Sequence, residues 1–358
     1  MRPLHRALSC TASRGSVKLF PAVPTVPDGL AYQPSCDKDW SYWERSIGIA
    51  KPADVIREDK AISWRELNIA YSDLKTELAE GRPTGAPWEG FTVAARQVFV
   101  DPPYHLVSLL TALKQAQGDR GPEEITILDH GCGGALTCLL LLANDYTGIF
   151  GVDVETSDCD KWNAFLRDQY GITEPRFFRY DGNRLPLDDG SIDFIFSQQV
   201  IEHVRPDVLD CYYNEEVRVL RYGGGAFHEV PHRLTPYDSH TCAWFLHFLP
   251  RELWLWLLEN ILKRDTATAR QAIFLRWPWI HKNAARRAFG TLTDLTRKRL
   301  ASKPDASVYD GPIGLRMIFY RMFNAPLIGG LLVAVLSNFV MMQTFSVKSP
   351  EKALGAGK

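Results

Sequence analysis

The chain lacks several features that would assign it to a specialised class of protein. Its 358 residues carry a formal net charge of −1, so no overall positive field is present to attract nucleic acid. None of its seven cysteines forms a CxxC pair, which argues against a structural zinc site and favours a reduced compartment. There is no internal repeat. With 46% hydrophobic and 23% charged residues, the composition is that of a globular protein, for which we predict a cytoplasmic location and no bound metal.

Residues 1–27 contain no acidic residue and no uninterrupted apolar core. The missing core argues against a secretory signal. The arginines, serines and threonines of this segment fit two alternatives, a disordered tail or an organelle transit peptide. The tail is the simpler interpretation, and targeting to an organelle stays open.

A turn rich in glycine lies between an apolar segment and the start of a helix, in the sequence Ile125-Thr-Ile-Leu-Asp-His-Gly-Cys-Gly-Gly-Ala135. Glycine permits positive φ and a close approach of the backbone to a ligand, and a helix beginning directly after such a turn can bind an anionic or nucleotide group. The dinucleotide fingerprint requires a third glycine at position 136, which is Leu here. This disfavours a dinucleotide-dependent oxidoreductase.

The following segments repeat an alternation of strand and helix, which predicts an α/β sheet. The helix after the turn is expected to reach about Asn144, and a second amphipathic helix covers 206–220, where the glycine run 223–225 ends it. The predicted strands are 125–130, 148–153, 177–181, 192–197 and 226–230. Acidic residues stand at the ends of the second and third strands, where a parallel sheet gathers its ligands.

This series of motifs resembles the class I S-adenosylmethionine-dependent methyltransferases, specifically the type 11 branch that includes quinone-biosynthesis enzymes. The matching motifs fall in order across about residues 100–232, although Ala135 stands where the family has its third glycine. They are Leu128-Asp-His-Gly-Cys-Gly-Gly134, Gly151-Val-Asp153, Asp181-Gly182, Leu185-Pro-Leu-Asp-Asp-Gly-Ser-Ile-Asp193, Val200-Ile-Glu-His-Val204 and Glu216-Val-Arg-Val-Leu-Arg-Tyr-Gly-Gly224.

The resemblance implies a seven-stranded, mostly parallel Rossmann-like sheet with helices on both faces, and S-adenosylmethionine as the methyl donor. Asp129 would hold the methionine amino group, Asp153 the ribose hydroxyls and Asp181 the adenine amino group. The remaining residues of the expected cofactor site are Gly131, Cys132, Gly133, Gly134, Val154, Gly182, Ser197 and Gln198. For each aspartate the alternative role is a helix cap, and Asp193 is interpreted as structural.

Methyl transfer to a hydroxyl would also need a base, and histidine has a suitable pKa. His232 and His240 follow the fifth predicted strand and rank ahead of His203, which follows the fourth. Each of them alone is more often a hydrogen-bonded structural residue than a base.

The flanking segments complete the expected organisation. Residues 1–37 form the tail, 38–100 a helical cap, 101–348 the methyltransferase domain and 349–358 a second tail. Within the domain, 233–310 is expected to be a helical insertion that carries the substrate specificity. Its aromatic and basic stretch 244–299 suits either a buried helical subdomain or peripheral contact with a membrane.

The apolar segment 325–342 is long enough to raise a membrane-spanning helix as a minority alternative. Gly329-Gly330 and Ser337-Asn338 interrupt it, which disfavours a span. The resemblance implies instead a helix, here over 326–336, followed by the final antiparallel strand, here over 339–347.

The sequence therefore predicts a methyltransferase acting on a small-molecule or lipid- or carbohydrate-linked acceptor, by branch analogy at oxygen. The alternatives are a non-catalytic module of the same fold that binds a membrane or a protein partner, and an RNA methyltransferase. No common RNA-binding module is recognisable in the chain.

Overall fold

The structure is a computed structural model that describes residues 64–81, 85–100, 102–103, 105–155, 158–238, 240–301, 313–326 and 328–349. The predictions for the tail 1–37, for the first part of the helical cap and for all but the first residue of the tail 349–358 lie outside these residues.

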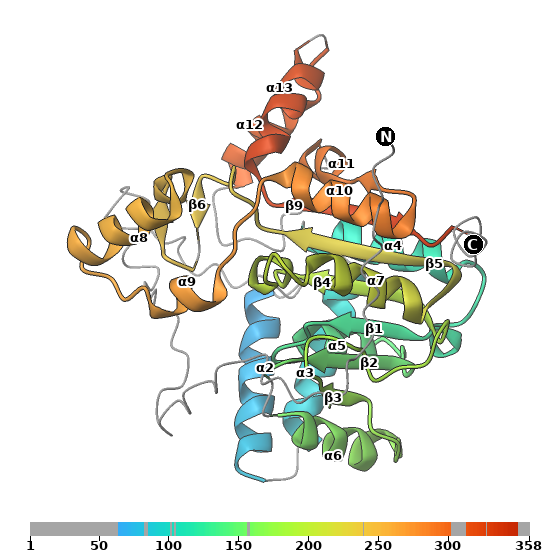
Figure 1. Ribbon diagram of the computed structural model, residues 1–358. Helices are drawn as coiled ribbons and strands as arrows, with labels where there is room; N and C mark the ends of the chain where they lie inside the picture. The colour runs from blue at the N-terminus through green and yellow to red at the C-terminus, as the bar shows by residue number, and fades with distance from the viewer. Residues whose placement is uncertain are drawn as a thin grey trace, which may run out of the picture.

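A seven-stranded sheet of order β3-β2-β1-β4-β5-β9-β8 forms the centre of the structure (Figure 1). Strands β1 to β5 are parallel, while β9 runs antiparallel to both β5 and β8. This confirms the predicted Rossmann-like α/β fold with its final antiparallel strand. The strands are β1 (Ile127–His130), β2 (Ile149–Asp153), β3 (Phe177–Arg179), β4 (Ile192–Gln198), β5 (Leu220–Val230), β8 (Thr293–Asp294) and β9 (Met342–Val347).

The fifth strand begins earlier than predicted. The helix α7 (Leu209–Val219) ends directly at β5, and the glycines 223–225, expected to precede the strand, lie within it. A Cβ on Gly225 would collide with the ring of Phe345 on β9. Glycine is therefore needed here for close packing between neighbouring strands rather than for a turn.

Helices cover both faces of the sheet, and the strands alternate between two cores. Ile127, Phe194 and Phe196 face one core, and Leu128 and Ile195 face the other. The first core is covered by α4 (Val107–Gln117), α5 (Leu136–Leu142) and α6 (Cys159–Tyr170). The second is covered by α7 and α10 (Pro278–Phe289).

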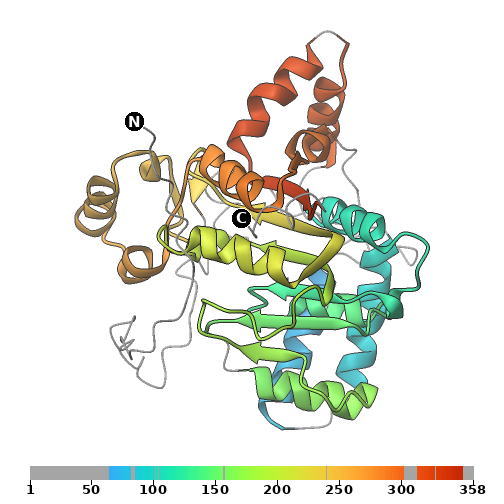
Figure 2. The same cartoon turned by 45° about the vertical axis from the view of Figure 1, so that its right-hand side comes forward.

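Two N-terminal helices, α2 (Trp64–Ala79) and α3 (Gly85–Val100), lie side by side on the first face (Figures 1 and 2). Leu67, Leu74 and Phe91 are fully buried there, in the same core as α5 and α6. The ring of Trp88 stacks on Phe91 at 5.4 Å between centroids. These helices are thus part of the main core, not a separately packed layer.

The segment between β5 and α10 has a small core of its own, formed by residues such as Trp254, Leu255 and Ile273. The buried-subdomain alternative therefore describes its interior, although Trp244 and Trp256 are 55% and 51% exposed. Because α10 and β8 belong to the sheet layers, the predicted insertion 233–310 leaves the sheet only over 233–277. Its elements are β6 (Tyr237–Asp238), β7 (Ala243–Trp244), η3 (Leu246–Phe248), α8 (Arg251–Asn260) and α9 (Ala267–Ala272).

The C-terminal part contains α11 (Thr296–Ala301), α12 (Ile313–Phe323), α13 (Gly329–Leu336) and η4 (Ser337–Phe339) before β9. The predicted helix over 326–336 and strand over 339–347 are confirmed, each starting three residues later than expected. Among the described residues, no helix combines the length and the apolar character needed to cross a bilayer.

Asp193, on β4, joins the base of the sheet to its surroundings, as its predicted structural role requires. Its side chain is 1% exposed and accepts bonds from Arg120 at 2.6 Å and Arg221 at 2.7 Å. It also accepts from the amide and hydroxyl of Thr126, at 2.9 and 2.8 Å.

We expect Asp193→Ala to lower the free energy of unfolding by about 2 kcal/mol, because the amide and hydroxyl of Thr126 lose their buried acceptor and two partly exposed arginines lose their ion pair. Asp207→Ala is the matched control. Its exposed pair with Arg205 should contribute only about 0.5 kcal/mol. Urea unfolding of both variants measures the difference, and equal losses would contradict a structural role specific to Asp193.

Candidate active site

The glycine turn follows β1 at the carboxyl edge of the parallel strands. Gly131 and Gly133 have φ of +97° and +46°, and a Cβ on Gly131 would collide with Val200. Ala135, at the missing third glycine, also adopts the left-handed region, with φ +63°. This conformation costs a non-glycine residue about 1 kcal/mol. The loop therefore keeps the shape of a glycine turn even where the sequence departs from it.

The turn is closed from outside by α2, whose Tyr71 hydroxyl donates to the carbonyl of Gly134. Burial raises the pKa of the Cys132 and Cys138 thiols, so both are neutral. Neither thiol belongs to a disulfide, whereas Cys242 forms one, which does not fit the reduced compartment expected from the sequence.

Asp129, at the end of β1, is 5% exposed and accepts a bond from the Cys138 thiol at 3.3 Å. Burial, together with the negative charge of Asp153, raises its pKa to about 8 against the effect of the thiol. Near pH 7 the Asp129 carboxyl is therefore protonated in most molecules, and a cation bound beside it would favour the ionised form.

Asp153 ends β2 on the same edge of the sheet. One carboxylate oxygen accepts from the amide of Gly133 at 2.9 Å, and the other from the amide of Glu155 at 3.0 Å. The side chain thus links the glycine turn to the end of β2 through a hydrogen bond. Val154, the next residue, is 43% exposed.

Asp181 follows β3, and its Oδ1 accepts from the amides of Asn183 and Arg184 at 2.9 and 3.2 Å. These amides outweigh the effect of partial burial and lower the pKa of Asp181. Gly182 has φ +79°, and a Cβ there would lie 3.5 Å from Val154. Val154 and Gly182, from different strand ends, therefore lie next to each other.

The residues at the end of β4 face different surroundings. The Ser197 side chain is fully buried, and its hydroxyl pairs with that of Tyr212 at 2.8 Å. Gln198 is partly exposed and accepts from the hydroxyl of Thr137 at 3.2 Å. Of these two predicted cofactor residues, only Gln198 has an accessible side chain at the carboxyl edge of the parallel strands, which is the rim of the candidate site.

Beyond β4, the short helix η2 (Ile201–His203) brings together Glu202, His203 and His240. Glu202 is 1% exposed, and neither of its carboxylate oxygens has a hydrogen bond within the described residues. His240 Nε2 lies 3.5 Å from its Oε1. Burial lowers the pKa of His240, but Glu202 and Asp238 outweigh burial and the net pKa is raised.

One ligand atom from each of these three residues lies within 4.8 Å of the others, a distance that a single ion could bridge. Carboxylate and imidazole ligands suit divalent transition metals. The sequence prediction of no metal therefore has a specific place where it can be tested.

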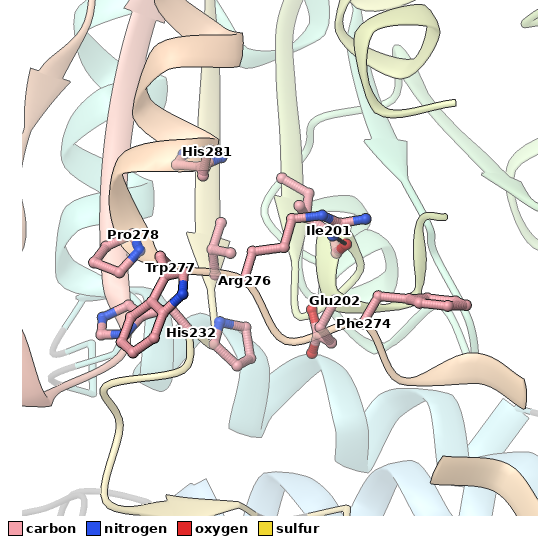
Figure 3. A pocket seen from close by; sticks show the side chains of 10 residues that line it. Ile201, Glu202, His232, Phe274, Arg276, Trp277, Pro278 and His281 are labelled. Carbon is pink, nitrogen blue, oxygen red and sulfur yellow. Dashed lines mark hydrogen bonds between the residues drawn. The ribbon is translucent and has the colours of Figure 1, made fainter. Parts of the chain in front are cut away.

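His232 lies apart from this group. Its Nε2 pairs with the carbonyl of Val340 at 2.9 Å, and its Nδ1 accepts from the amide of Leu234 at 3.2 Å. Burial lowers its pKa to about 4. Figure 3 shows His232 and Glu202 on opposite sides of a cavity of about 10 Å³, with Arg276 between them. Of the predicted bases, the structure brings together His203 and His240 but not His232.

Arg276 connects the insertion to the turn after β4. Its guanidinium donates to the carbonyls of Ile201, at 2.6 Å, and of Val204. In addition, the amide of Phe274 donates to the carbonyl of Glu202 at 2.6 Å. The segment 274–276 thereby fixes the position of Glu202, and part of the predicted basic surface is in fact internal structure.

Sequence reasoning missed a buried group below the rim. Glu216 on α7 is 0% exposed and pairs with His130 of β1 at 2.9 Å and His228 of β5 at 2.8 Å. Burial alone would raise its pKa, but the two imidazoles lower it to about 2. His130 and Glu216 both lie in the quoted motifs, yet nothing in their spacing along the chain indicates the contact.

Residues 128–228 match a family described as a methyltransferase domain, of type 11. No curated protein matches the chain at a significant level. Similar solved structures include geranyl diphosphate C-methyltransferase from Streptomyces coelicolor A3(2), at 15% identity over 71% of this chain and 85% of that one, with a TM-score of 0.39. A phosphoethanolamine N-methyltransferase from Haemonchus contortus is also 15% identical, over 68% and 53% of the two chains, with a TM-score of 0.37. Similarities this weak carry no information about the acceptor.

The domain match and the sheet order agree with each other. The chain carries an S-adenosylmethionine-dependent methyltransferase domain with a class I, Rossmann-like fold.

If Asp129 holds the methionine ammonium, as the resemblance implies, its raised pKa predicts that binding of S-adenosylmethionine releases a proton, because the ammonium favours the ionised carboxyl. Affinity should therefore rise between about pH 6 and pH 8, and Asp129→Asn should abolish this rise and weaken binding about tenfold. Titration calorimetry in buffers of different ionisation enthalpy measures the released proton.

The same variant provides a control for folding. When the pKa of a carboxyl is higher in the folded than in the unfolded chain, the folded state becomes less stable as pH rises from the unfolded pKa to the folded pKa. At pH 8 Asp129→Asn should thus unfold at no lower temperature than the unmodified protein. Proton release unchanged by the substitution would assign the effect to another group.

Proposed function

We propose that the protein transfers a methyl group from S-adenosylmethionine to an oxygen atom of a small-molecule or lipid- or carbohydrate-linked acceptor. The main observation in support of this proposal is the pairing of Glu202 with His240 next to the cofactor turn. We also propose that the chain belongs to the quinone-biosynthesis-like branch, on the motifs Asp181-Gly182 and Val200 to Val204.

The residues at the rim fit the donor. Asp129 is a buried carboxyl that ionises readily only beside a cation, and the methionine portion carries an ammonium group. Asp153 can exchange its bond to Gly133 for the ribose hydroxyls, which frees that amide to face the donor. Val154 and Gly182 form an apolar surface against which the purine ring can pack, and Asp181 lies beside this surface to accept from the exocyclic amine. We assign Gly131, Cys132, Gly134 and Gln198 to the walls of this site, and Ser197 to its support.

The acceptor side lies next to this rim. Val200 packs on Gly131, and Glu202 follows only two residues later, so the cofactor turn and the Glu202–His240 pair share one wall. The bound sulfonium supplies an electrophilic methyl group. The protein must then align the acceptor with it and remove the acceptor proton.

His240 is the proposed base. Its Nε2 faces the buried Glu202 carboxylate, so in the neutral ring the other nitrogen, Nδ1, accepts the hydroxyl proton while Glu202 stabilises the imidazolium that results. His203, whose Nδ1 pairs with the carbonyl of Ala272 at 2.9 Å, packs edge-on against His240 at 5.0 Å and orients its ring. His232, with both nitrogens bonded to backbone, is assigned to support of the loop.

We expect Asp153→Ala to weaken binding of S-adenosylmethionine and S-adenosylhomocysteine at least about tenfold, since two hydrogen bonds to the ribose are lost. Asp153→Asn is the matched variant, because its side-chain oxygen can still accept from Gly133. Calorimetry should show both variants weakened. If only the alanine variant bound the donor more weakly, Asp153 would serve to hold the glycine turn in place and not to bind the ribose.

The proposed pairing also predicts how His240 titrates. Glu202 raises the pKa of His240, so Glu202→Gln should lower this pKa and move the rise of activity with pH to lower pH. Histidine NMR measures this pKa without knowledge of the acceptor. Glu259→Gln, which removes an exposed carboxylate of α8, is the control and should leave the His240 titration unchanged.

The acceptor class is tested by transfer of a radiolabelled methyl group into extract fractions. Label in the lipid or sugar pool, lost in His240→Asn, supports the proposal. Label in nucleic acid alone would replace it with an RNA methyltransferase. Binding of the donor without any transfer would favour the non-catalytic module.

A further inference from the structure

The helices α12 and α13 project from the body of the molecule as a hairpin, which both views show clearly (Figures 1 and 2). Gly329 is buried at the start of α13, and a Cβ there would collide with the carbonyl of Phe323 at the end of α12. Glycine at this position therefore allows the two helices to meet closely. The hairpin is anchored at its base by η4 and β9 and takes no part in the site described above.

The surface of this hairpin is apolar where a surface helix is normally polar. Along α13 and its ends, Ile328, Leu331, Val335 and Phe339 are 59%, 67%, 49% and 40% exposed. Their spacing of three or four residues puts them on one stripe of the helix. On α12, the exposed apolar residues are Ile318, Phe319 and Met322, at 54%, 42% and 41%.

The charge around the stripe has one sign. Residues 313–339 contain no aspartate or glutamate. Arg321 is exposed on α12. The adjoining helix α11, which contacts both α12 and α13, adds the exposed Arg297 and Lys298. An apolar stripe bordered by arginine and lysine is complementary to an anionic lipid surface.

The hairpin is too short to span a bilayer. An α-helix rises about 1.5 Å per residue, so α12 and α13, with 11 and 8 residues, reach about halfway across a hydrocarbon core of about 30 Å. Such helices can enter only one leaflet.

We propose that the α12–α13 hairpin inserts its apolar stripe into one leaflet of an anionic membrane and holds the protein at that surface. The predicted membrane contact was expected in 244–299, so this assigns it to a different segment. The inference rests on the hairpin alone and does not depend on the proposed methyl transfer.

The test is cosedimentation of the full chain with vesicles of phosphatidylcholine, or of equal parts phosphatidylcholine and phosphatidylserine. We expect binding to the mixed vesicles. Leu331→Lys combined with Val335→Lys should reduce the partition coefficient at least about tenfold, because two inserted apolar side chains are lost. The control, Ile69→Lys with Val100→Lys, removes exposed apolar residues of α2 and α3 and adds the same charge.

The two variants separate insertion from simple attraction of charge. Both gain two positive charges, so a purely electrostatic contact would strengthen in both, whereas insertion weakens only in the hairpin variant. Unchanged thermal unfolding shows that the hairpin variant is folded. Absence of binding by the unmodified chain, or equal binding by both variants, overturns the proposal. Loss of an oligomer in the hairpin variant, without vesicle binding, would assign the stripe to a second copy of the chain.

Discussion

The arrangement of the sheet edge depends on one buried carboxylate. Glu216 lies where water cannot reach it, and a charge in such a place is tolerated only when hydrogen-bonded partners surround it. Its partners come from β1 and β5, and His130 pairs further with the hydroxyl of Tyr180 at 2.8 Å and stacks on Tyr212 at 4.0 Å. One helix is thereby held against strands at the centre of the sheet. The loops that leave those strands start from fixed positions.

From this support the rim acquires two chemically different halves. Beside β1 to β3 stand carboxylates whose oxygens are engaged by backbone amides or held neutral by burial, a surface suited to a polar nucleoside with a positive charge. Beside β4 and the insertion stand imidazoles and Glu202, whose oxygens accept no bond among the described residues. The two halves, proposed for donor and acceptor, thus differ in how completely their polar atoms are already satisfied.

The sequence predicted the parallel strands and the glycine turn, because each leaves a local pattern of apolar residues and glycines, while the final antiparallel strand was predicted from the resemblance to the methyltransferases. It predicted the start of β5 wrongly, since the requirement for glycine at 225 comes from Phe345 on a distant strand. The partners of Glu216 and the separation of His232 from His240 were equally out of reach. Both depend on which side chains meet after folding, as does the internal use of Arg276, a residue that composition alone would put on the surface.

Arg276 has a further consequence for how specificity could evolve in this protein. Because its guanidinium is bonded to the carbonyls of the turn that carries Glu202, the insertion and the sheet core are joined rigidly at this point. Residues introduced in the insertion to accommodate a new acceptor would therefore shift the proposed proton-accepting pair along with them. Selectivity and reactivity would then change together, and the range of acceptors open to the fold narrows to those that suit both.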